Sequence, residues 1–372
     1  MIKIFHMGDN HLDSPFSRLS PSAREKERER QRALFKKMVA YVKENRYDIL
    51  LISGDLFDTP DVSYETEKAV IEAFSSLECP VVIAPGNHDP YLKVSLYSSD
   101  KLPENVYVFN STELQVFEFE ELSASVVGYA FTRDEYLESP FSSVSLDNLG
   151  GTKLLCAHCD FGVNASKYAP ISESELISLG FAYAALGHVH KLSDPIRIGK
   201  GLAAYCGFPE GRAFDEEGAG GALAVTVDGD SVTAERVIFA ERRYLYDALD
   251  ISGAENDGEI VERIASHIGE KGYDSNTALR LTLLGTVSID YTPDKSLIEH
   301  MLLPYLMSVE IIDKTIPEID EKSLENDYTL RGEVYRALKP KLASDDPEEQ
   351  RRAAEALKVS ILAIEGRRIS FE

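Results

Sequence analysis

The chain has 372 residues, of which 44% are hydrophobic, and carries a formal net charge of −24. This is enough apolar material for more than one domain, while no apolar run is long enough for a secretory signal or a membrane span. Four cysteines are too few for a disulfide framework, so we expect a cytoplasmic protein with free thiols. The acidic balance argues against a broadly basic, polyanion-binding surface.

Short β-rich runs alternate with helical patterns in the first two hundred residues. IKIFHM is followed by a long charged helix, and YDILLISGD and PVVIAPGN are separated by another helix. Ser20 and Pro21 suit the N-cap and first position of the long helix, which should reach about Asn45. We expect its segment AREKERERQR to be a solvent-exposed face with paired charges.

The apolar runs that follow predict two packed sheets. VYVF, LQVFEF, SASVVGYA, KLLCAHC and FAYAALGH are more strands than one open sheet comfortably holds. We therefore predict an α/β (α+β) fold, an αββα four-layer sandwich with helices on the outer faces. Cys156 and Cys159 form a C-x-x-C without a matching second pair, so packing is favoured over a zinc site.

The pattern changes after residue 240. It reads strand, helix, strand, helix and strand in YLYDALDI, DGEIVERIASHIGEK, TALRLTLLGTVS, SLIEHMLLPYL and VEIIDK. The remaining segment reads as helices divided by Pro340 and the motif SDDPEE, with LKVSILAI packed inside the chain or, alternatively, against a partner helix. We predict a main domain at 1–240, an α+β capping domain at 241–317 and a C-terminal helical segment at 318–372.

Polar side chains gather at the ends of the apolar runs, where α/β folds place their ligand-binding loops. Each has an ordinary explanation as a helix cap, a turn residue or a packed histidine, but together they use five of the eight histidines. Histidine, aspartate and asparagine without a thiolate pair suit manganese or iron better than a structural zinc. The residues are Asp9, His11, Asp55, Asp58, Asn87, His88, Asp89, His158, His188 and His190.

The order of the motifs D-x-H, GD-x-x-D, GNHD, a single histidine at a strand end and GH-x-H resembles that of the calcineurin-like metallophosphoesterases. The likeness covers residues 9–190, about half of the chain. GDNHLDSPF, KYAPIS, ALGHVH and YCGFPEGRAFDEEG are further similar to the SbcD-type DNA repair exonucleases, in particular their YhaO-like bacterial branch. The resemblance implies two divalent metal ions, expected to be Mn²⁺, with Fe²⁺ or Mg²⁺ as alternatives.

The resemblance also assigns roles to individual residues. It implies a first ion held by Asp9, His11 and His190, a second ion held by Asn87, His158 and His188, and Asp55 as the bridge between them. In an extended segment, His188 and His190 lie on one face roughly 7 Å apart, which suits ligands to adjacent ions.

Three further roles concern the surroundings of the ions. His88 is beside a ligand but assigned to no ion, so we expect it to protonate the leaving oxygen, with Asp89 orienting it. Asp58 is a candidate to orient a metal ligand. Arg212 is a candidate to contact a phosphate, and an ion pair with Glu210 or Asp215 is an equal alternative.

The function implied is a Mn²⁺-dependent exonuclease and endonuclease of DNA repair, in which two ions activate a hydroxide. Its implied partners are DNA, a second copy of the chain and an SbcC-like SMC-type coiled-coil ATPase. A metallophosphatase or small-nucleotide phosphodiesterase is an alternative that the acidity favours and the long C-terminal part disfavours. A scaffold that binds DNA ends or an ATPase with weak catalysis is disfavoured, because every ligand and His88 are present.

Overall fold

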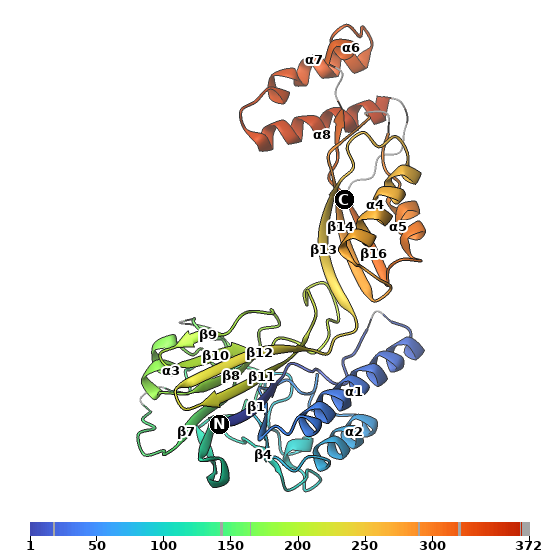
Figure 1. Cartoon of the computed structure of the whole chain (residues 1–372). Helices are drawn as coiled ribbons and strands as arrows, with labels where there is room; N and C mark the ends of the chain where they lie inside the picture. The colour runs from blue at the N-terminus through green and yellow to red at the C-terminus, as the bar shows by residue number, and fades with distance from the viewer. Residues whose placement is uncertain are drawn as a thin grey trace. The chain divides into compact units, whose positions relative to one another are not determined.

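The computed structural model describes residues 1–17, 19–141, 144–163, 165–288, 291–318, 321–364 and 366. They form two compact units, Met1–Arg243 and Tyr244–Glu372 (Figure 1). The finer division of the second unit into a cap and a helical segment remains a prediction. Among the helices of the described ranges, none is long and apolar enough to cross a membrane.

The first sheet of the first unit has six strands in the order β12-β11-β1-β2-β3-β4. β1 to β4 are mutually parallel, whereas β11 is antiparallel to both β1 and β12. The register places Ile4 opposite Ile49 and Leu51 opposite Val82. The bounds are β1 (Ile2–Met7), β2 (Ile49–Ile52), β3 (Val81–Ile83), β4 (Val106–Val108), β11 (Gly221–Asp228) and β12 (Ser231–Ile238).

The second sheet also has six strands, in the order β5-β6-β7-β8-β10-β9. Its four inner strands are parallel, and its edge strands β5 and β9 are antiparallel to their neighbours. The sequence pattern did not predict β9 and β10 of this sheet or β11 of the first sheet. The bounds are β5 (Gln115–Phe119), β6 (Ala124–Gly128), β7 (Thr152–His158), β8 (Tyr183–Gly187), β9 (Ile196–Ile198) and β10 (Gly201–Tyr205).

The two sheets pack face to face, because the strands alternate their side chains between two apolar layers. Along β1, Ile2 and Ile4 belong to the cluster between the sheets, together with Val126 and Leu154 of the second sheet. Phe5 and Met7 belong instead to the cluster under the helices of the first sheet. The predicted αββα arrangement is confirmed, and its fourth layer is formed by α3 (Glu173–Leu179) and neighbouring loops.

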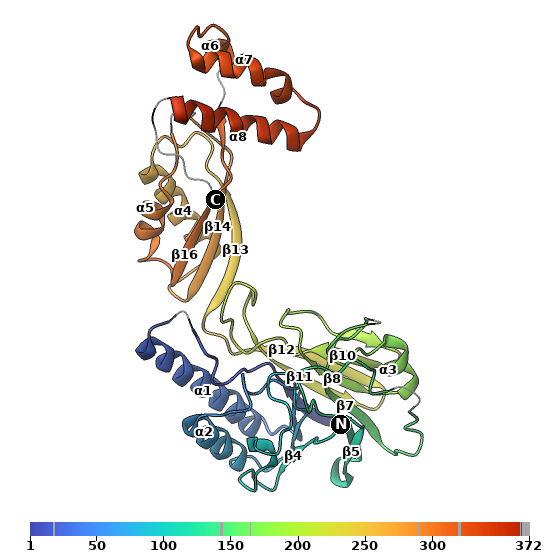
Figure 2. The ribbon, with the colours of Figure 1, turned by 180° about the vertical axis from the view of Figure 1, so that it is seen from behind.

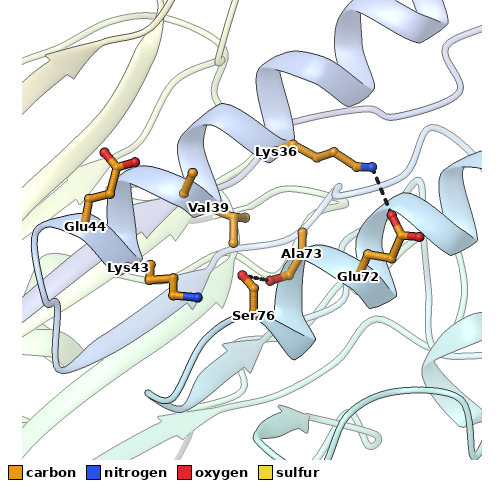
Figure 3. A pocket seen from close by; sticks show the side chains of 8 residues that line it. Lys36, Val39, Lys43, Glu44, Glu72, Ala73 and Ser76 are labelled. Atoms are coloured by element: carbon orange, nitrogen blue, oxygen red, sulfur yellow. Dashed lines mark hydrogen bonds and ion pairs between the residues drawn. The ribbon is translucent and has the colours of Figure 1, made fainter.

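Two helices, α1 (Pro21–Glu44) and α2 (Tyr64–Ser75), lie side by side on the first sheet (Figures 1 and 2). The side chain of Ser20 accepts a hydrogen bond from the Ala23 N–H, as its predicted N-cap role requires. The rings of Phe35 and Phe74 meet edge to face with centroids 5.6 Å apart. A hollow of about 240 Å³ between the helices contains the Lys36–Glu72 ion pair (Figure 3).

The predicted packing of the C-x-x-C pair is confirmed. Cys156 is completely buried in the layer between the two sheets, and Cys159 is completely buried in the outer layer of the second sheet. Both are free thiols, as are Cys79 and Cys206.

The second unit contains a three-stranded sheet in the order β13-β14-β16, with α4 and α5 on the same face (Figures 1 and 2). Its core joins Ile260 and Ile264 of α4 to Leu279 and Leu281 of β14. The predicted order of strands and helices is confirmed, and α5 ends before Pro304. The bounds are β13 (Arg243–Asp250), α4 (Asp257–Lys271), β14 (Thr277–Leu284), β15 (Thr286–Ser288), α5 (Lys295–Leu302), β16 (Ser308–Asp313) and β17 (Ile316–Glu318).

Three helices follow in the same unit, namely α6 (Glu321–Glu325), α7 (Leu330–Leu342) and α8 (Pro347–Ile364). The apolar stretch of α8 packs within the chain, since Leu357 and Ile361 form a cluster with Tyr335 of α7 and Leu324 of α6. The sequence predicts two helices divided by Pro340 and the motif SDDPEE, and the break falls at residues 343–346, at the start of that motif. Pro340 itself is not part of the break, because it lies in the last turn of α7.

Candidate metal centre

The candidate site lies where the carboxyl ends of strands from both sheets meet. After β1 and β2 end, their continuations stay side by side through backbone hydrogen bonds from Asp9 N to Gly54 O and from His11 N to Asp55 O, both 2.9 Å long. Asp9, His11 and Asp55 are thereby brought together, although they come from different βα connections. On the other sheet, His158 is the last residue of β7, and His188 follows β8.

Several of the predicted ligands have a left-handed backbone. φ is 50° at Asp9, 45° at His11, 49° at Asp55 and 102° at His188. Residues other than glycine seldom adopt such values, and the cost is of order 1–3 kcal/mol each. Strained residues of this kind concentrate at functional sites, where the surrounding structure holds side chains in a fixed arrangement.

A first cluster is formed by Asp9, His11 and His190, whose potential ligand atoms lie within 4.8 Å of one another. The two Nε2 atoms of His11 and His190 are only 3.1 Å apart. On the far side of each ring, His190 Nδ1 lies 2.9 Å from Glu216 Oε1 and His11 Nδ1 lies 3.3 Å from Asp58 Oδ1. These carboxylates favour a proton on both Nδ1 atoms, so both Nε2 lone pairs point to the same place.

This convergence requires a positive charge between the rings. Burial lowers the pKa of His11 to about 4. Burial also disfavours a charged His190, but the carboxylates of Asp9 and Glu216 outweigh it and raise the pKa of His190 to about 10. A proton on His190 satisfies the contact in the chain alone, and a cation bound to both Nε2 atoms and to Asp9 would replace that proton. The donor set therefore fits a divalent ion.

A second cluster adjoins the first and has Asp9 in common with it. It contains Asp9, Asp55 and His158, and the Asn87 side chain lies beside it. His158 Nδ1 lies 3.0 Å from the Ser53 carbonyl oxygen, to which it must donate, and burial lowers the pKa of His158. The unprotonated Nε2 then faces Asn87 Oδ1 at 3.0 Å and Asp55 Oδ2 at 3.4 Å. With these two oxygens beside it, the Nε2 lone pair is placed as a metal ligand would be.

Asp55 lies between the clusters, because its Oδ2 is also 3.7 Å from His11 Nε2. This is the position that a bridging ligand would occupy. His188 lies at the edge of the second cluster, and its ring centroid is 5.1 Å from that of His158. Its backbone N–H donates to both oxygens of Asp9, each 3.1 Å away, and its Nε2 is 3.5 Å from Asp160 Oδ1.

His88 is exposed and lies against the first cluster, with its ring centroid 4.7 Å from that of His11. Its Nδ1 is 3.2 Å from the Asp58 carbonyl oxygen, and its backbone N–H donates to Asp55 Oδ1. The predicted pairing of His88 with Asp89 is corrected here, because within the described chain the hydrogen bond on the His88 ring joins it to Asp58.

Asp89 is buried and accepts four hydrogen bonds. Three come from the backbone N–H groups of Asp55, Phe57 and Gly86, at 3.1, 3.1 and 2.8 Å. The fourth comes from the hydroxyl of Tyr97, at 2.5 Å, which belongs to the short 3₁₀ helix Leu96–Ser98. Asp89 thus fixes the loop after β2, which carries Asp55, against the loop after β3.

Arg212 has different partners from those predicted. Glu210 pairs with Arg30 of α1, whereas Arg212 binds Glu216 through its Nε and Nη2 and lies 3.5 Å from Asp58 Oδ1. Glu216 was missed by the sequence analysis, although it is only 2% exposed. Burial would raise its pKa, but hydrogen bonds from His190 and Arg212 lower the pKa of Glu216 to about 2.

Helix α1 also reaches the site, a contact that was not predicted from the sequence. The side-chain amide of Gln31 donates to the His11 carbonyl oxygen at 3.0 Å, and Arg28 Nε donates to the Ser14 carbonyl oxygen at 3.1 Å. The mixed-charge half of this helix is therefore only partly the solvent-exposed face that its sequence predicted. Part of it supports the loop that carries His11.

Comparison with known proteins agrees with the geometry of a metal-binding site. Residues 2–192 match the family model of the calcineurin-like phosphoesterases. The chain is 27% identical to the uncharacterized metallophosphoesterase YhaO of Bacillus subtilis (strain 168), over 77% of this chain and 72% of that protein. The matched share exceeds the length of the first unit, so the likeness to YhaO extends into the second unit.

Two further relatives carry names that refer to nucleic acid. The chain is 28% identical to the DNA double-strand break repair protein Mre11 of Aeropyrum pernix, over 64% of this chain and 61% of that protein. It is 25% identical to a component of the nuclease SbcCD of Bacillus subtilis (strain 168), over 66% of this chain and 71% of that protein.

Proposed function

The chain belongs to the calcineurin-like phosphoesterase family, and from this premise we propose that it is a Mn²⁺-dependent nuclease that hydrolyses phosphodiester bonds of DNA. The observation that carries the proposal is the pair of adjoining clusters that share Asp9 and have Asp55 between them, with the exposed His88 beside them. The choice of DNA is supported by the two relatives named for double-strand break repair and for nuclease activity. By resemblance, the reaction would be 3′-to-5′ exonucleolytic and, on single strands, endonucleolytic.

The proposal gives each cluster a role. Asp9, His11 and His190 would hold one ion, Asn87, His158 and His188 the other, and Asp55 both. When bound, two divalent ions supply Lewis-acid chemistry, because they lower the pKa of a water molecule and neutralise the charge of the phosphodiester. Mn²⁺ fits the mixture of nitrogen and oxygen donors, and Fe²⁺ or Mg²⁺ would fit the same set less specifically.

His88 would donate a proton to the leaving oxygen. It is exposed to solvent, so a substrate can reach it, and the bond of its Nδ1 to the Asp58 carbonyl oxygen fixes Nδ1 as the protonated nitrogen. In that orientation, Nε2 would first take up a proton from solvent and then give it to the leaving oxygen, while Nδ1 keeps its own proton. Asp89 would act indirectly on the metal centre, because it holds the backbone that positions Asp55.

A small-nucleotide phosphodiesterase or a phosphatase is the second candidate. The net charge of −24 favours it, because a DNA duplex is repelled by acidic surface more strongly than a small substrate is. The resemblance further suggests a homodimer and an SbcC-like SMC-type ATPase as partners. The apolar face of α8 is already packed inside the chain, so such a partner would need other surface or would have to displace α7.

The test is an assay of the full chain with Mn²⁺ on end-labelled duplex DNA, on single-stranded DNA and on a chromogenic phosphodiester. We expect DNA cleavage by the wild type. We expect Asp55→Ala to lose bound Mn²⁺ together with activity, whereas His88→Ala should retain Mn²⁺ and lose most of its turnover, by about 10²–10⁴-fold. Bound Mn²⁺ is measured by elemental analysis after gel filtration.

The matched control is His300→Ala, which removes an exposed histidine from α5 of the second unit and should leave activity unchanged. Hydrolysis of the chromogenic ester without cleavage of either DNA would contradict the nuclease and favour the small-substrate enzyme. Equal loss of Mn²⁺ in the Asp55 and His88 variants would contradict the division of roles.

A further inference from the structure

We propose that Asp58, Arg212 and Glu216 are positioning residues that make the Asp9–His11–His190 site the tighter of the two ion sites, and the one that is filled first. The inference rests on the metal centre of the proposed function and concerns the order and strength of ion binding. It does not depend on which phosphoester is the substrate.

The three residues complete a closed ring with the two histidines of the first cluster. Glu216 Oε1 lies 2.9 Å from His190 Nδ1, and Asp58 Oδ1 lies 3.3 Å from His11 Nδ1. Arg212 joins the two carboxylates, because its Nη2 binds Glu216 and its Nη1 lies 3.5 Å from Asp58 Oδ1. The contact of 3.1 Å between the two Nε2 atoms closes the ring.

The nitrogen atoms of Arg212 are all used within this closed ring of side chains and by the neighbouring Ser14. Its backbone N–H donates to Glu216 Oε2 at 2.8 Å, its Nε lies within 3.2 Å of both Glu216 oxygens, and its Nη1 also donates to the Ser14 hydroxyl. Every guanidinium nitrogen therefore already has a partner. Between two carboxylates that would otherwise repel each other, the guanidinium keeps both ionised and in place.

The histidines of the second cluster are supported more weakly. His158 donates its Nδ1 proton to the neutral carbonyl oxygen of Ser53. His188 has the carboxylate of Asp160 near its Nε2, at a distance of 3.5 Å. The Asp160 side chain is 26% exposed, whereas that of Glu216 is 2% exposed. A carboxylate behind an imidazole makes the ring a stronger metal ligand than a carbonyl does, and the effect grows with burial.

The two sites should therefore differ in affinity although they share Asp55. Loss of such a supporting partner typically costs about 10–100-fold in metal affinity. Both histidines of the first site have a buried or largely buried carboxylate behind them. In the second site the corresponding carboxylate oxygens are farther away, at 3.9 Å from His158 Nδ1 to Asp9 Oδ1 and at 3.5 Å from His188 Nε2 to Asp160 Oδ1.

The experiment is a calorimetric titration of the metal-free full chain with Mn²⁺. We expect two binding steps of different affinity. Asn87→Ala, which removes a ligand of the second site alone, should abolish the weaker step and so identify it. Glu216→Gln should raise the dissociation constant of the tighter step by about 10–100-fold and leave the weaker step in place.

Asp58→Asn provides an independent variant and should act in the same direction on the same step. Asp160→Asn is the matched control, because it removes the carboxylate beside His188 and should affect only the weaker step. Thermal unfolding of each metal-free variant shows whether the first unit is folded. If Glu216→Gln does not fold, the result for Asp58→Asn decides.

The proposal is overturned if the two steps have equal Mn²⁺ affinity. It is also overturned if Glu216→Gln and Asp58→Asn weaken the step that Asn87→Ala abolishes. No binding of Mn²⁺ by the wild type would overturn both this inference and the metal centre. Two ordered steps in a protein that cleaves no DNA would overturn the proposed nuclease and leave the order of filling intact.

Discussion

The carboxylate of Asp89 shows how one buried side chain can organise a site that it does not enter. It receives hydrogen bonds from three backbone N–H groups on two loops and from the hydroxyl of Tyr97. The motif GNHD made Asp89 look like a companion of His88, because the two are adjacent in sequence. Adjacent residues of a loop often point in different directions, and here His88 is exposed while Asp89 is buried.

Asp89→Asn should therefore destabilise the loops in addition to slowing any reaction. The amide places two N–H donors among groups that are already donors, so at least one buried backbone N–H loses its acceptor, at a cost of about 1–3 kcal/mol. We expect a lower midpoint of chemical denaturation and weaker Mn²⁺ binding. Tyr97→Phe removes a single donor and should cost less. An Asp89→Asn protein with normal stability and Mn²⁺ affinity but no turnover would restore the catalytic pairing with His88.

Residue types and their positions after strands were sufficient to identify the side chains that form the two clusters. They were not sufficient to identify Glu216. It lies in FDEEG next to two other acidic residues, and nothing in the sequence distinguishes the buried one from its neighbours. The structure singles it out because Arg212 and His190 both point at it.

At the scale of elements, the site depends on the close approach of two strand ends from different sheets. Gly187, the last residue of β8, lies against Ser53, the first residue after β2. A Cβ atom at Gly187 would lie 2.0 Å from the Ser53 carbonyl oxygen, far inside van der Waals contact. The same carbonyl oxygen accepts the proton of His158 Nδ1.

Gly187→Ala should push the two sheets apart at the metal centre. The obstacle is backbone rather than a flexible side chain, so relief requires movement of a strand, and we expect a loss of about 1–3 kcal/mol in the free energy of unfolding. Mn²⁺ binding should weaken as well, because Ser53 orients His158. Gly150→Ala is the control, since a Cβ there meets nothing within 4 Å. Equal stability of the two variants would show that the strand ends tolerate separation.

Most strands and helices were predictable because their apolar residues follow the period of the element. The exceptions have physical reasons. Strands β10 and β11 begin with GLAA and GALA, where glycine, alanine and leucine stand in place of the β-branched residues typical of strands. Pro340 is tolerated in α7 because the helix ends two residues later, so few helical turns are disturbed.

At the scale of the whole molecule, the chain is two units with separate cores, and all predicted ligands belong to the first. A ligand that binds only the folded first unit stabilises that unit alone. Calorimetric unfolding of the full chain should show one transition that Mn²⁺ raises and a chelator lowers, and one that responds to neither. With free Mn²⁺ at 100 times its dissociation constant, the stabilisation is about 2.7 kcal/mol. Two transitions that shift together would contradict this independence.

The strand order of the first sheet also bears on biosynthesis. β1, which leads directly to Asp9 and His11, has β2 on one side and β11 on the other, and β11 lies more than two hundred residues later in the chain. A polypeptide emerging from the ribosome therefore leaves one edge of β1 bare until residues 221–228 have been made. Glu216, which supports His190, emerges only shortly before them, so the pocket is assembled near the end of translation of the first unit.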